Sequence, residues 1–280
     1  MAIVLATLAV ATSASAEIPW ITSADGPADA TAPAERGARV QVEPIPPPPI
    51  AAGCTTGTVS RVAATTDPAQ RWLVGTVSTN WKVALYTGSG PRGTVAVIGD
   101  SLTLAAQEET MRYLINAGFG PICIDGGVAR RVGPTTNSPV SSGVEVIGRI
   151  RASDPVWSDP SVHWVLAFGT NDVGSSTSTY AAAIQRGIAA VGVTSYPIRW
   201  VDVRTRRNED TRNPAPPDWR FLENTWNAKL VAAGLRIIGW SAATATTPSR
   251  YIIALPDYVH LTTTGEVLRG DLIGQSLVAG

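Results

Sequence analysis

The stretch Val95–Leu102, with the sequence VAVIGDSL, decides the fold of this chain. Its first four residues are apolar without polar alternation, which is typical of a strand buried on both faces of a parallel sheet. The segment 103–117 that follows has the length and the amphipathic spacing of a helix. Strand and helix together predict a β-α step in which Ser101 lies at the carboxyl edge of the sheet, where such sheets bind ligands.

The alternation of short apolar runs with amphipathic segments continues to the C-terminus. Strands are predicted at 94–98, 122–125, 162–168, 198–203 and 235–240, and helices near 103–117, 141–152, 177–190, 218–233 and 264–278. Gly118 and Gly234 follow two of these helices, where a left-handed residue commonly ends a helix. The pattern predicts an α/β fold with an open, doubly wound parallel sheet of about five strands and helices on both faces.

Composition divides the chain into four parts. Residues 1–16 are apolar and then small and end in Ala-Ser-Ala, the pattern of a signal peptide, although no Lys or Arg stands at their start. Residues 17–52 are rich in Ala and Pro and are expected to form a disordered spacer. Residues 53–92 alternate Thr, Val and Trp with turn residues, which predicts short strands that decorate the main domain, 93–280.

The signal-like segment predicts a protein that is secreted or associated with the cell envelope. A membrane anchor would need about 20 apolar residues, and Ser13, Ser15 and Glu17 interrupt the run, so no integral membrane segment is expected after cleavage. Cys54 and Cys123 are predicted to form a disulfide, because such bridges persist outside the cytosol. The alternative, lipidation of Cys54, needs an apolar segment before it, and the chain has prolines there.

The charges of the chain balance, with 22 Lys and Arg against 22 Asp and Glu. No net charge therefore attracts nucleic acid or an anionic bilayer, and the expected partner is a small molecule or a neutral polymer, bound by a monomer. The two cysteines and two histidines have no ligand spacing among them, and no phosphate-binding glycine loop is present. Neither a metal nor a cofactor is predicted.

Three polar motifs supply the parts of a catalytic site. Ser101 follows a strand and stands beside the backbone N–H groups at the start of a helix. Asn171 also follows a strand, and its amide can donate to an oxyanion. Asp257 precedes His260 by three residues and can hold one ring nitrogen while the other acts as a base. A helix cap, an Asx turn and a surface turn are the ordinary alternatives, but together the motifs provide a nucleophile, a base and an oxyanion donor.

An imidazole base has to be His163 or His260, because the chain has no other histidine. His163 begins a predicted strand and therefore lies at the edge opposite the ligand-binding one. We predict a structural role for His163 and a catalytic role for His260.

The segments Gly99–Leu102, Gly169–Asp172 and Asp257–His260 resemble blocks I, III and V of the SGNH (GDSL) hydrolases. They occur in the family's order, and the resemblance covers roughly residues 93–280. It implies a flavodoxin-like three-layer α/β/α sandwich and ester hydrolysis without a cofactor. It also implies that Ser101 attacks the ester, that His260 and Asp257 activate it, and that Asn171 and the Ser101 N–H hold the oxyanion.

Block II of that family normally has a glycine whose N–H also donates to the oxyanion. Here the region 124–131 reads IDGGVARR. The spacing after Asp125 and the arginine that follows align the family glycine with Ala129, and Gly127 is the second choice. A backbone donor needs no particular side chain, so alanine can serve where its dihedral angles allow.

The expected function is that of a secreted serine esterase for carboxylic esters. Segments beside the predicted site, 135–139, 174–178 and the Arg-rich loop 204–214, are polar, which favours short acyl groups such as acetyl on an envelope or extracellular glycan. The loop 204–214 either meets an anionic or sugar substrate or is simply solvated. Alternatives are an acyltransferase that uses the same acyl-enzyme, an esterase or lipase for longer chains, and a catalytically silent envelope-binding module.

Overall fold

The computed structural model describes residues 58–61, 72–135, 140–212, 217–254 and 257–280. The predicted signal peptide, the spacer and Cys54 lie outside these residues, so the Cys54–Cys123 bridge stays a prediction. Cys123 itself lies fully buried in a strand of the sheet. Within the described ranges, no helix has the length and apolar character that crossing a bilayer requires.

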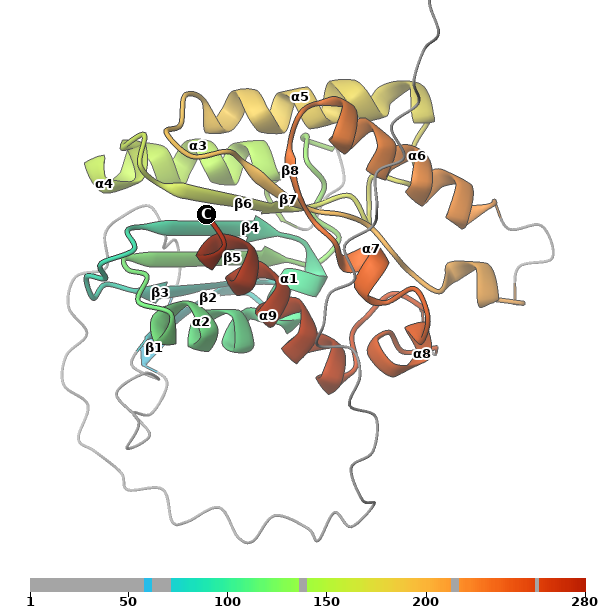
Figure 1. Ribbon diagram of the computed structural model, residues 1–280, viewed down its shortest axis with the longest axis horizontal. Coiled ribbons are helices and arrows are strands. Elements are labelled where there is room, and N and C mark those ends of the chain that lie inside the picture. Colours follow the sequence, from blue (N-terminus) through green and yellow to red (C-terminus); the bar gives the residue numbers. More distant parts are fainter. Residues whose placement is uncertain (1–57, 62–71, 136–139, 213–216, 255–256) are drawn as a thin grey trace, which may run out of the picture. The chain divides into compact units, whose positions relative to one another are not determined.

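Five parallel strands form one continuous part of a single sheet, as predicted (Figure 1). Their order is β5-β4-β6-β7-β8, and each pairs in parallel with its neighbours. Their bounds are Val95–Gly99 for β4, Ile122–Gly127 for β5, His163–Ala167 for β6, Arg199–Val201 for β7 and Arg236–Ile238 for β8. The carboxyl ends of β4, β5 and β6 therefore meet at one edge, where polar loops follow them.

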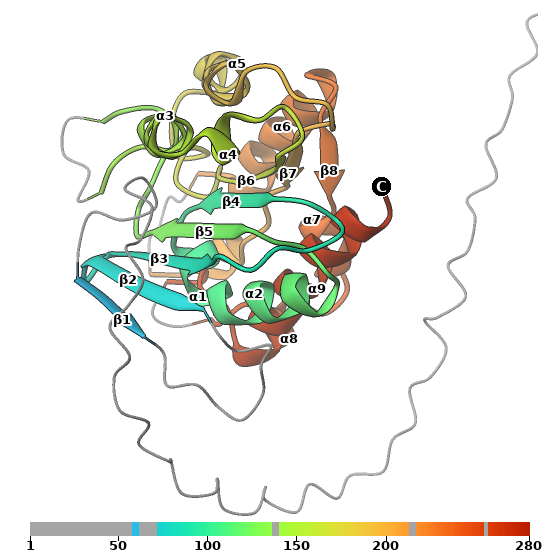
Figure 2. The ribbon, with the colours of Figure 1, turned by 90° about the vertical axis from the view of Figure 1, so that its left-hand side faces the viewer.

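Three antiparallel strands extend this sheet beyond β5, so that the described residues form eight strands (Figure 2). They are β1 (Thr58–Arg61), β2 (Leu73–Ser78) and β3 (Trp81–Tyr86). β3 pairs with the whole of β5, and Leu85 lies opposite Cys123. The strands expected to decorate the domain therefore belong to the same sheet as the parallel strands. Their pairing covers the edge of β5, which would otherwise have unpaired N–H and C=O groups.

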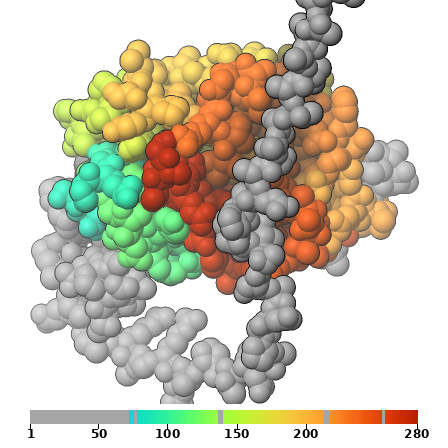
Figure 3. All heavy atoms as spheres, viewed as in Figure 1, coloured from blue at the N-terminus to red at the C-terminus, as the bar shows by residue number. Residues whose placement is uncertain are grey.

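Helices cover both faces of the sheet (Figure 2). Val95 and Val97 of β4 pack into one core and Ala96 and Ile98 into the other, as the alternation of side chains along a strand requires. One face carries α3 (Gly143–Ser153), α4 (Pro155–Ser158), α5 (Tyr180–Val191) and α6 (Trp219–Ala232). The other carries α1 (Ser101–Ala105), α2 (Gln107–Asn116), α7 (Trp240–Ala243) and α9 (Thr263–Val278), with α9 packed on α2 (Figure 3).

Local sequence explains where these helices begin and end. Ser142 caps α3 in a capping box, in which its hydroxyl accepts from the Glu145 N–H and its own N–H donates to the Glu145 carboxylate. Gly118 and Gly234 have φ angles of 86° and 72°, as predicted for residues that end a helix. The helices α4, α7 and α8 (Pro248–Tyr251) have four residues each and were not predicted, because one turn is too short for an apolar period.

Candidate functional site

The candidate nucleophile Ser101 stands at a sharp turn between β4 and α1. Gly99 permits this turn, because a Cβ there would lie 1.9 Å from Thr103 Oγ1 and 2.8 Å from the Ala167 carbonyl oxygen. The Asp100 carboxylate accepts from the Leu102 N–H at 3.0 Å and so caps α1. Ser101 is the first residue of α1 and is 7% exposed, and its own N–H has no intrahelical partner. Neither the Ser101 hydroxyl nor its N–H has a hydrogen-bond partner among the described residues, so both are available at the carboxyl edge of the sheet.

Asp257 and His260 are brought together by a short turn that precedes α9. The Asp257 carboxylate accepts hydrogen bonds from the backbone N–H of Val259 at 3.0 Å and of His260 at 3.2 Å, and from Nδ1 of the His260 ring. Burial pushes the pKa of Asp257 upward, but these hydrogen bonds outweigh it and hold the pKa below its ordinary value. An ionised Asp257 keeps the proton on Nδ1, so Nε2 of the ring is free to accept one.

The His260 ring is accessible, since 41% of its side chain is exposed. Within the described residues it makes no hydrogen bond to the Ser101 hydroxyl. His260 nevertheless lies close enough to Asp100, the residue before Ser101, to act on its carboxylate electrostatically. Burial raises the pKa of Asp100, and the nearby Arg269 and His260 oppose that rise. Looser contacts between nucleophile and base are common in proteins without bound substrate.

The two loops with the candidate oxyanion donors are joined by a hydrogen bond. Nδ2 of Asn171 donates to the carbonyl oxygen of Arg130 at 3.2 Å, which leaves its second N–H available. In the loop after β5, the Val128 N–H donates to Asn80 and the Arg130 N–H to Gly127. The N–H between them, that of Ala129, has no hydrogen-bond partner among the described residues.

Ala129 has a left-handed backbone with a φ of 57° and is exposed. This conformation favours glycine, which fits the alignment of Ala129 with the family glycine. Gly127, the second choice, is buried in β5 opposite Trp81. A Cβ on Gly127 would lie 2.8 Å from Nη2 of Arg130, so the absence of a side chain there makes room for that guanidinium.

The fully buried side chain of Arg130 connects three parts of the site, a role that the sequence does not predict. Nη1 donates to the carbonyl oxygens of Gly99 and Asp125, each at 3.0 Å, and pairs with the Asp125 carboxylate at 2.7 Å. Nε donates to the Ser141 carbonyl oxygen at 3.0 Å. Burial raises the pKa of Asp125, and Arg130 is the largest influence that opposes this rise. The strand before the nucleophile and the loop with Ala129 are thus held by one side chain.

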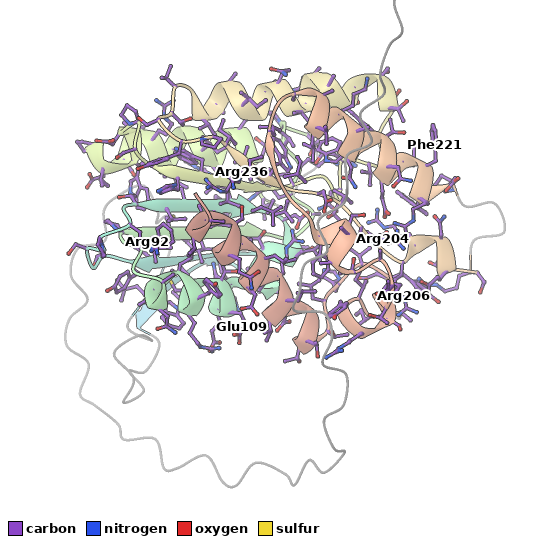
Figure 4. All side chains as sticks on the ribbon, viewed as in Figure 1. Arg92, Glu109, Arg204, Arg206, Phe221 and Arg236 are labelled. Atoms are coloured by element: carbon purple, nitrogen blue, oxygen red, sulfur yellow. The ribbon has the colours of Figure 1, made fainter. Side chains whose placement is uncertain are left out.

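The Arg-rich loop is anchored to the site rather than simply solvated. The backbone N–H of Arg206 donates to the Tyr258 carbonyl oxygen at 2.8 Å, and its Nη1 donates to that of Ile252 at 2.9 Å. Nη1 of Arg207 donates to the Thr170 carbonyl oxygen at 3.1 Å. Figure 4 shows Arg204 and Arg206 near α7 and α8, far from Arg92 at the other end of the sheet. The mixed charge of the Arg-rich loop does not predict these contacts, because the accepting carbonyl groups belong to residues that are distant in the sequence.

His163 has the structural role predicted for it. It is the first residue of β6, stacks on Tyr196 at a ring distance of 4.0 Å and meets the edge of Phe119. Burial lowers its pKa. Among the residues that the structure describes, no group of three or more His, Cys, Asp or Glu side chains is arranged to hold a metal ion.

Comparison with known proteins gives structural likeness only. A scan against protein-family models and a search of curated proteins found no match. The lipase/acylhydrolase from Enterococcus faecalis is similar with a TM-score of 0.48 and 17% identity, over 66% of this chain and 95% of that chain. A member of the lipolytic protein G-D-S-L family from Veillonella parvula is similar with a TM-score of 0.46 and 16% identity, over 67% of this chain and 97% of that chain. The C-terminal catalytic domain of Streptococcus pneumoniae peptidoglycan O-acetyltransferase A is similar with a TM-score of 0.45 and 16% identity, over 69% of this chain and 95% of that chain.

Proposed function

We propose that this chain is a serine esterase of the SGNH hydrolase type, with Ser101 as nucleophile, His260 as general base and Asp257 as the group that orients the base. The observation that carries the proposal is the hydrogen bond between His260 Nδ1 and the ionised Asp257, which leaves Nε2 free. The strand β4 places Ser101 at the carboxyl edge of the sheet, and Asp100, the residue before it, lies close enough to His260 for a protonated imidazole to lower the pKa of its carboxylate. A nucleophile, a base and an orienting carboxylate are the parts that acyl transfer through an acyl-enzyme requires.

In the proposed reaction, the Ser101 hydroxyl attacks the ester carbonyl while Nε2 of His260 accepts its proton. Asp257 stabilises the imidazolium that forms. The imidazolium then protonates the departing alcohol, and an acyl group stays on Ser101. Water enters, gives a proton to His260 and attacks the acyl group, which leaves as an acid while Ser101 regains its proton.

The negative oxygen of each tetrahedral intermediate needs donors that are already in position. The Ser101 N–H, the Ala129 N–H and the Asn171 amide are the proposed donors. Support comes from the left-handed Ala129, whose N–H has no partner in the part of the chain that the structure describes, and from the hydrogen bond of Asn171 Nδ2 to the carbonyl oxygen of Arg130. Arg130 holds this loop against the end of β4.

For the substrate we propose a short acyl ester, such as an acetyl ester, of an extracellular or cell-envelope glycan, hydrolysed by a secreted protein. The described segment 174–178, which follows Asn171 closely in the chain, is polar, and Arg207 of the Arg-rich loop donates to the carbonyl oxygen of Thr170. A site for long acyl chains would need a continuous apolar groove. The signal-like residues 1–16 support export, and mass spectrometry of the N-terminus of the protein recovered from the medium tests it.

The test of the activity is hydrolysis of p-nitrophenyl esters from acetate to palmitate at fixed detergent. We expect kcat/KM to be highest for the shortest esters, and Ser101→Ala and His260→Ala each to reduce kcat by several orders of magnitude. Ser195→Ala, at an exposed serine, is the matched control. Wild-type rates in either catalytic variant would remove the mechanism, and a maximum at eight carbons or longer would remove the short-acyl proposal. A glycan acceptor added in excess separates hydrolysis from acyl transfer.

A further inference from the structure

A small cavity lies beside the two loops that carry Ala129 and Asn171. It has a volume of about 100 Å³ and lies between the loop after β5, the loop after β6 and the helices α5 and α6. A single water needs about 10–15 Å³ by the same kind of measure, so the cavity has room for a carboxylate with its hydration. Arg131 and Asp172 line it, and they directly follow Arg130 and Asn171, the two residues joined at the oxyanion site.

Two arginines from different elements line this cavity. Arg131 comes from the loop after β5, and its Nη1 donates to the Ser175 hydroxyl at 3.0 Å. Arg186 comes from α5 and packs against Gly133, where a Cβ would lie 3.3 Å from its Nε and Nη2. Neither guanidinium forms an ion pair with a carboxylate of the described residues. Toward the residues that the structure describes, most of their N–H groups are therefore available to a ligand.

The acidic residue of the cavity does not cancel these charges at neutral pH. The Asp172 carboxylate accepts from the Val132 N–H at 3.3 Å and makes no ion pair. Burial raises the pKa of Asp172 to about 7, despite the opposing influence of Arg131 and Arg186. Tyr180, the other titratable group in the lining, has a pKa raised by burial and is neutral. The cavity is therefore positive at and below neutral pH.

We propose that this cavity is a subsite for a carboxylate on the alcohol part of the substrate, held by Arg131 and Arg186. This inference rests on the proposed esterase function. Arginine suits the task because its planar guanidinium presents paired donors to a carboxylate. A short acyl group ends at the nucleophile, so the part of the substrate that reaches the cavity is the alcohol. The substrate class is then an acyl ester of an acidic sugar.

The matched probes are a methyl glucuronoside and the corresponding glucuronamide, which have the same shape and differ in charge. Each is used in acetylated form as a substrate, with acetate release measured, and in free form as an inhibitor of p-nitrophenyl acetate hydrolysis. We expect the wild-type protein to prefer the carboxylate over the amide in both assays. A hydrogen bond to a charged group has a strength that corresponds to about tenfold or more in affinity, so Arg186→Gln should reduce this preference about tenfold.

Arg186 is the sharper variant because it is exposed and its replacement should leave the protein folded, and Arg131→Gln gives a second reading. Arg92→Gln, which removes an exposed charge at the opposite end of the sheet, should keep the preference (Figure 4). Equal kcat/KM and equal inhibition by carboxylate and amide would overturn the subsite, and so would a preference that survives both arginine variants. If either of these two outcomes is found while p-nitrophenyl acetate is still hydrolysed, only the proposed subsite is contradicted. If no ester is hydrolysed, the esterase function fails.

Discussion

Nη1 of Arg130 lies 3.0 Å from the carbonyl oxygen of Gly99, the last residue of β4. The same nitrogen contacts the Asp125 carbonyl oxygen and carboxylate, so the ends of two neighbouring strands are tied by one buried cation. Arg130 also follows Ala129 and accepts from Asn171 through its own carbonyl oxygen. A shift of this guanidinium would therefore move the proposed nucleophile and two proposed oxyanion donors relative to one another.

Gly127→Ala should disturb this arrangement without removing a charge. The new Cβ would lie within 2.8–3.0 Å of the Arg130 guanidinium atoms and would displace them. A misplacement of about 1 Å can cost about 10²-fold in rate, so we expect a fall in kcat of about 10-fold or more, with a smaller change in KM. Gly148→Ala is the control, because a Cβ there meets nothing within 4 Å on helix α3. Equal kcat values for Gly127→Ala and the wild type would contradict the positioning role.

Ala129→Gly should keep the activity and relieve strain. A left-handed alanine costs roughly 1–2 kcal/mol, and the extra freedom of glycine in the unfolded chain takes back about 0.5–1 kcal/mol. We expect kcat to stay within about twofold of wild type, because the backbone donor is kept, and the free energy of unfolding to rise by up to about 1 kcal/mol. Urea titration measures this. Ala117→Gly, at a right-handed position, should instead lower it. Equal losses in both variants would argue against strain at Ala129.

Asn171→Ala should mainly reduce kcat. Loss of one oxyanion donor costs about 10²–10³ in turnover, or about 2.7–4 kcal/mol. The substrate in its ground state makes little use of this donor, so KM should change little. Asn116→Ala, at an exposed position at the end of α2, should leave both constants unaltered. A large rise in KM with unchanged kcat for Asn171→Ala would assign the amide to substrate binding instead.

Asp172→Asn should change how stability depends on pH. The pKa of Asp172 rises from an ordinary 3.8 to about 7 through burial, so the folded protein favours the protonated form. That contribution to stability is complete below about pH 4 and is lost as the pH rises through 7. At pH 8 the variant should therefore gain about 4 kcal/mol over the wild type, relative to their difference at pH 4.

Denaturant titrations at both pH values measure this change. Asp202, whose pKa burial raises to about 6, leaves part of the pH dependence in both proteins. A difference between the variant and the wild type that is the same at pH 4 and pH 8 would show that Asp172 does not titrate in this range.

The sequence was sufficient for those parts of the fold that depend on local patterns. The side chains of the apolar run Val95–Ile98 all require burial, and the run forms β4, which has parallel neighbours on both sides and a core on each face. The pairing of β3 with β5 was not predictable, because an antiparallel addition to a sheet edge depends on contacts between residues about 40 positions apart. The four-residue helices have no period to detect.

The candidate site also has one part that the local sequence predicts and one part that it does not. Asp257 and His260 are three residues apart, and one turn brings them into hydrogen-bond contact. Arg130 and Arg206 could not be assigned from the sequence, because each donates to carbonyl oxygens that the fold brings from distant segments, such as Gly99 and Ile252. An arginine in a loop of mixed charge gives no sign of these partners. The residue types predict the chemistry of the site. Only the fold shows which arginines hold its segments together.

The most direct test of the central claim is covalent labelling of the full-length protein with a fluorophosphonate, read by intact mass and peptide mapping. The proposed mechanism predicts one adduct per protein, on Ser101, formed quickly in the wild type and at least about 10²-fold more slowly in His260→Ala, since the activated hydroxyl is the reacting group. Labelling of a different serine, or equal labelling rates in the wild type and His260→Ala, would contradict the assignment of Ser101 and His260.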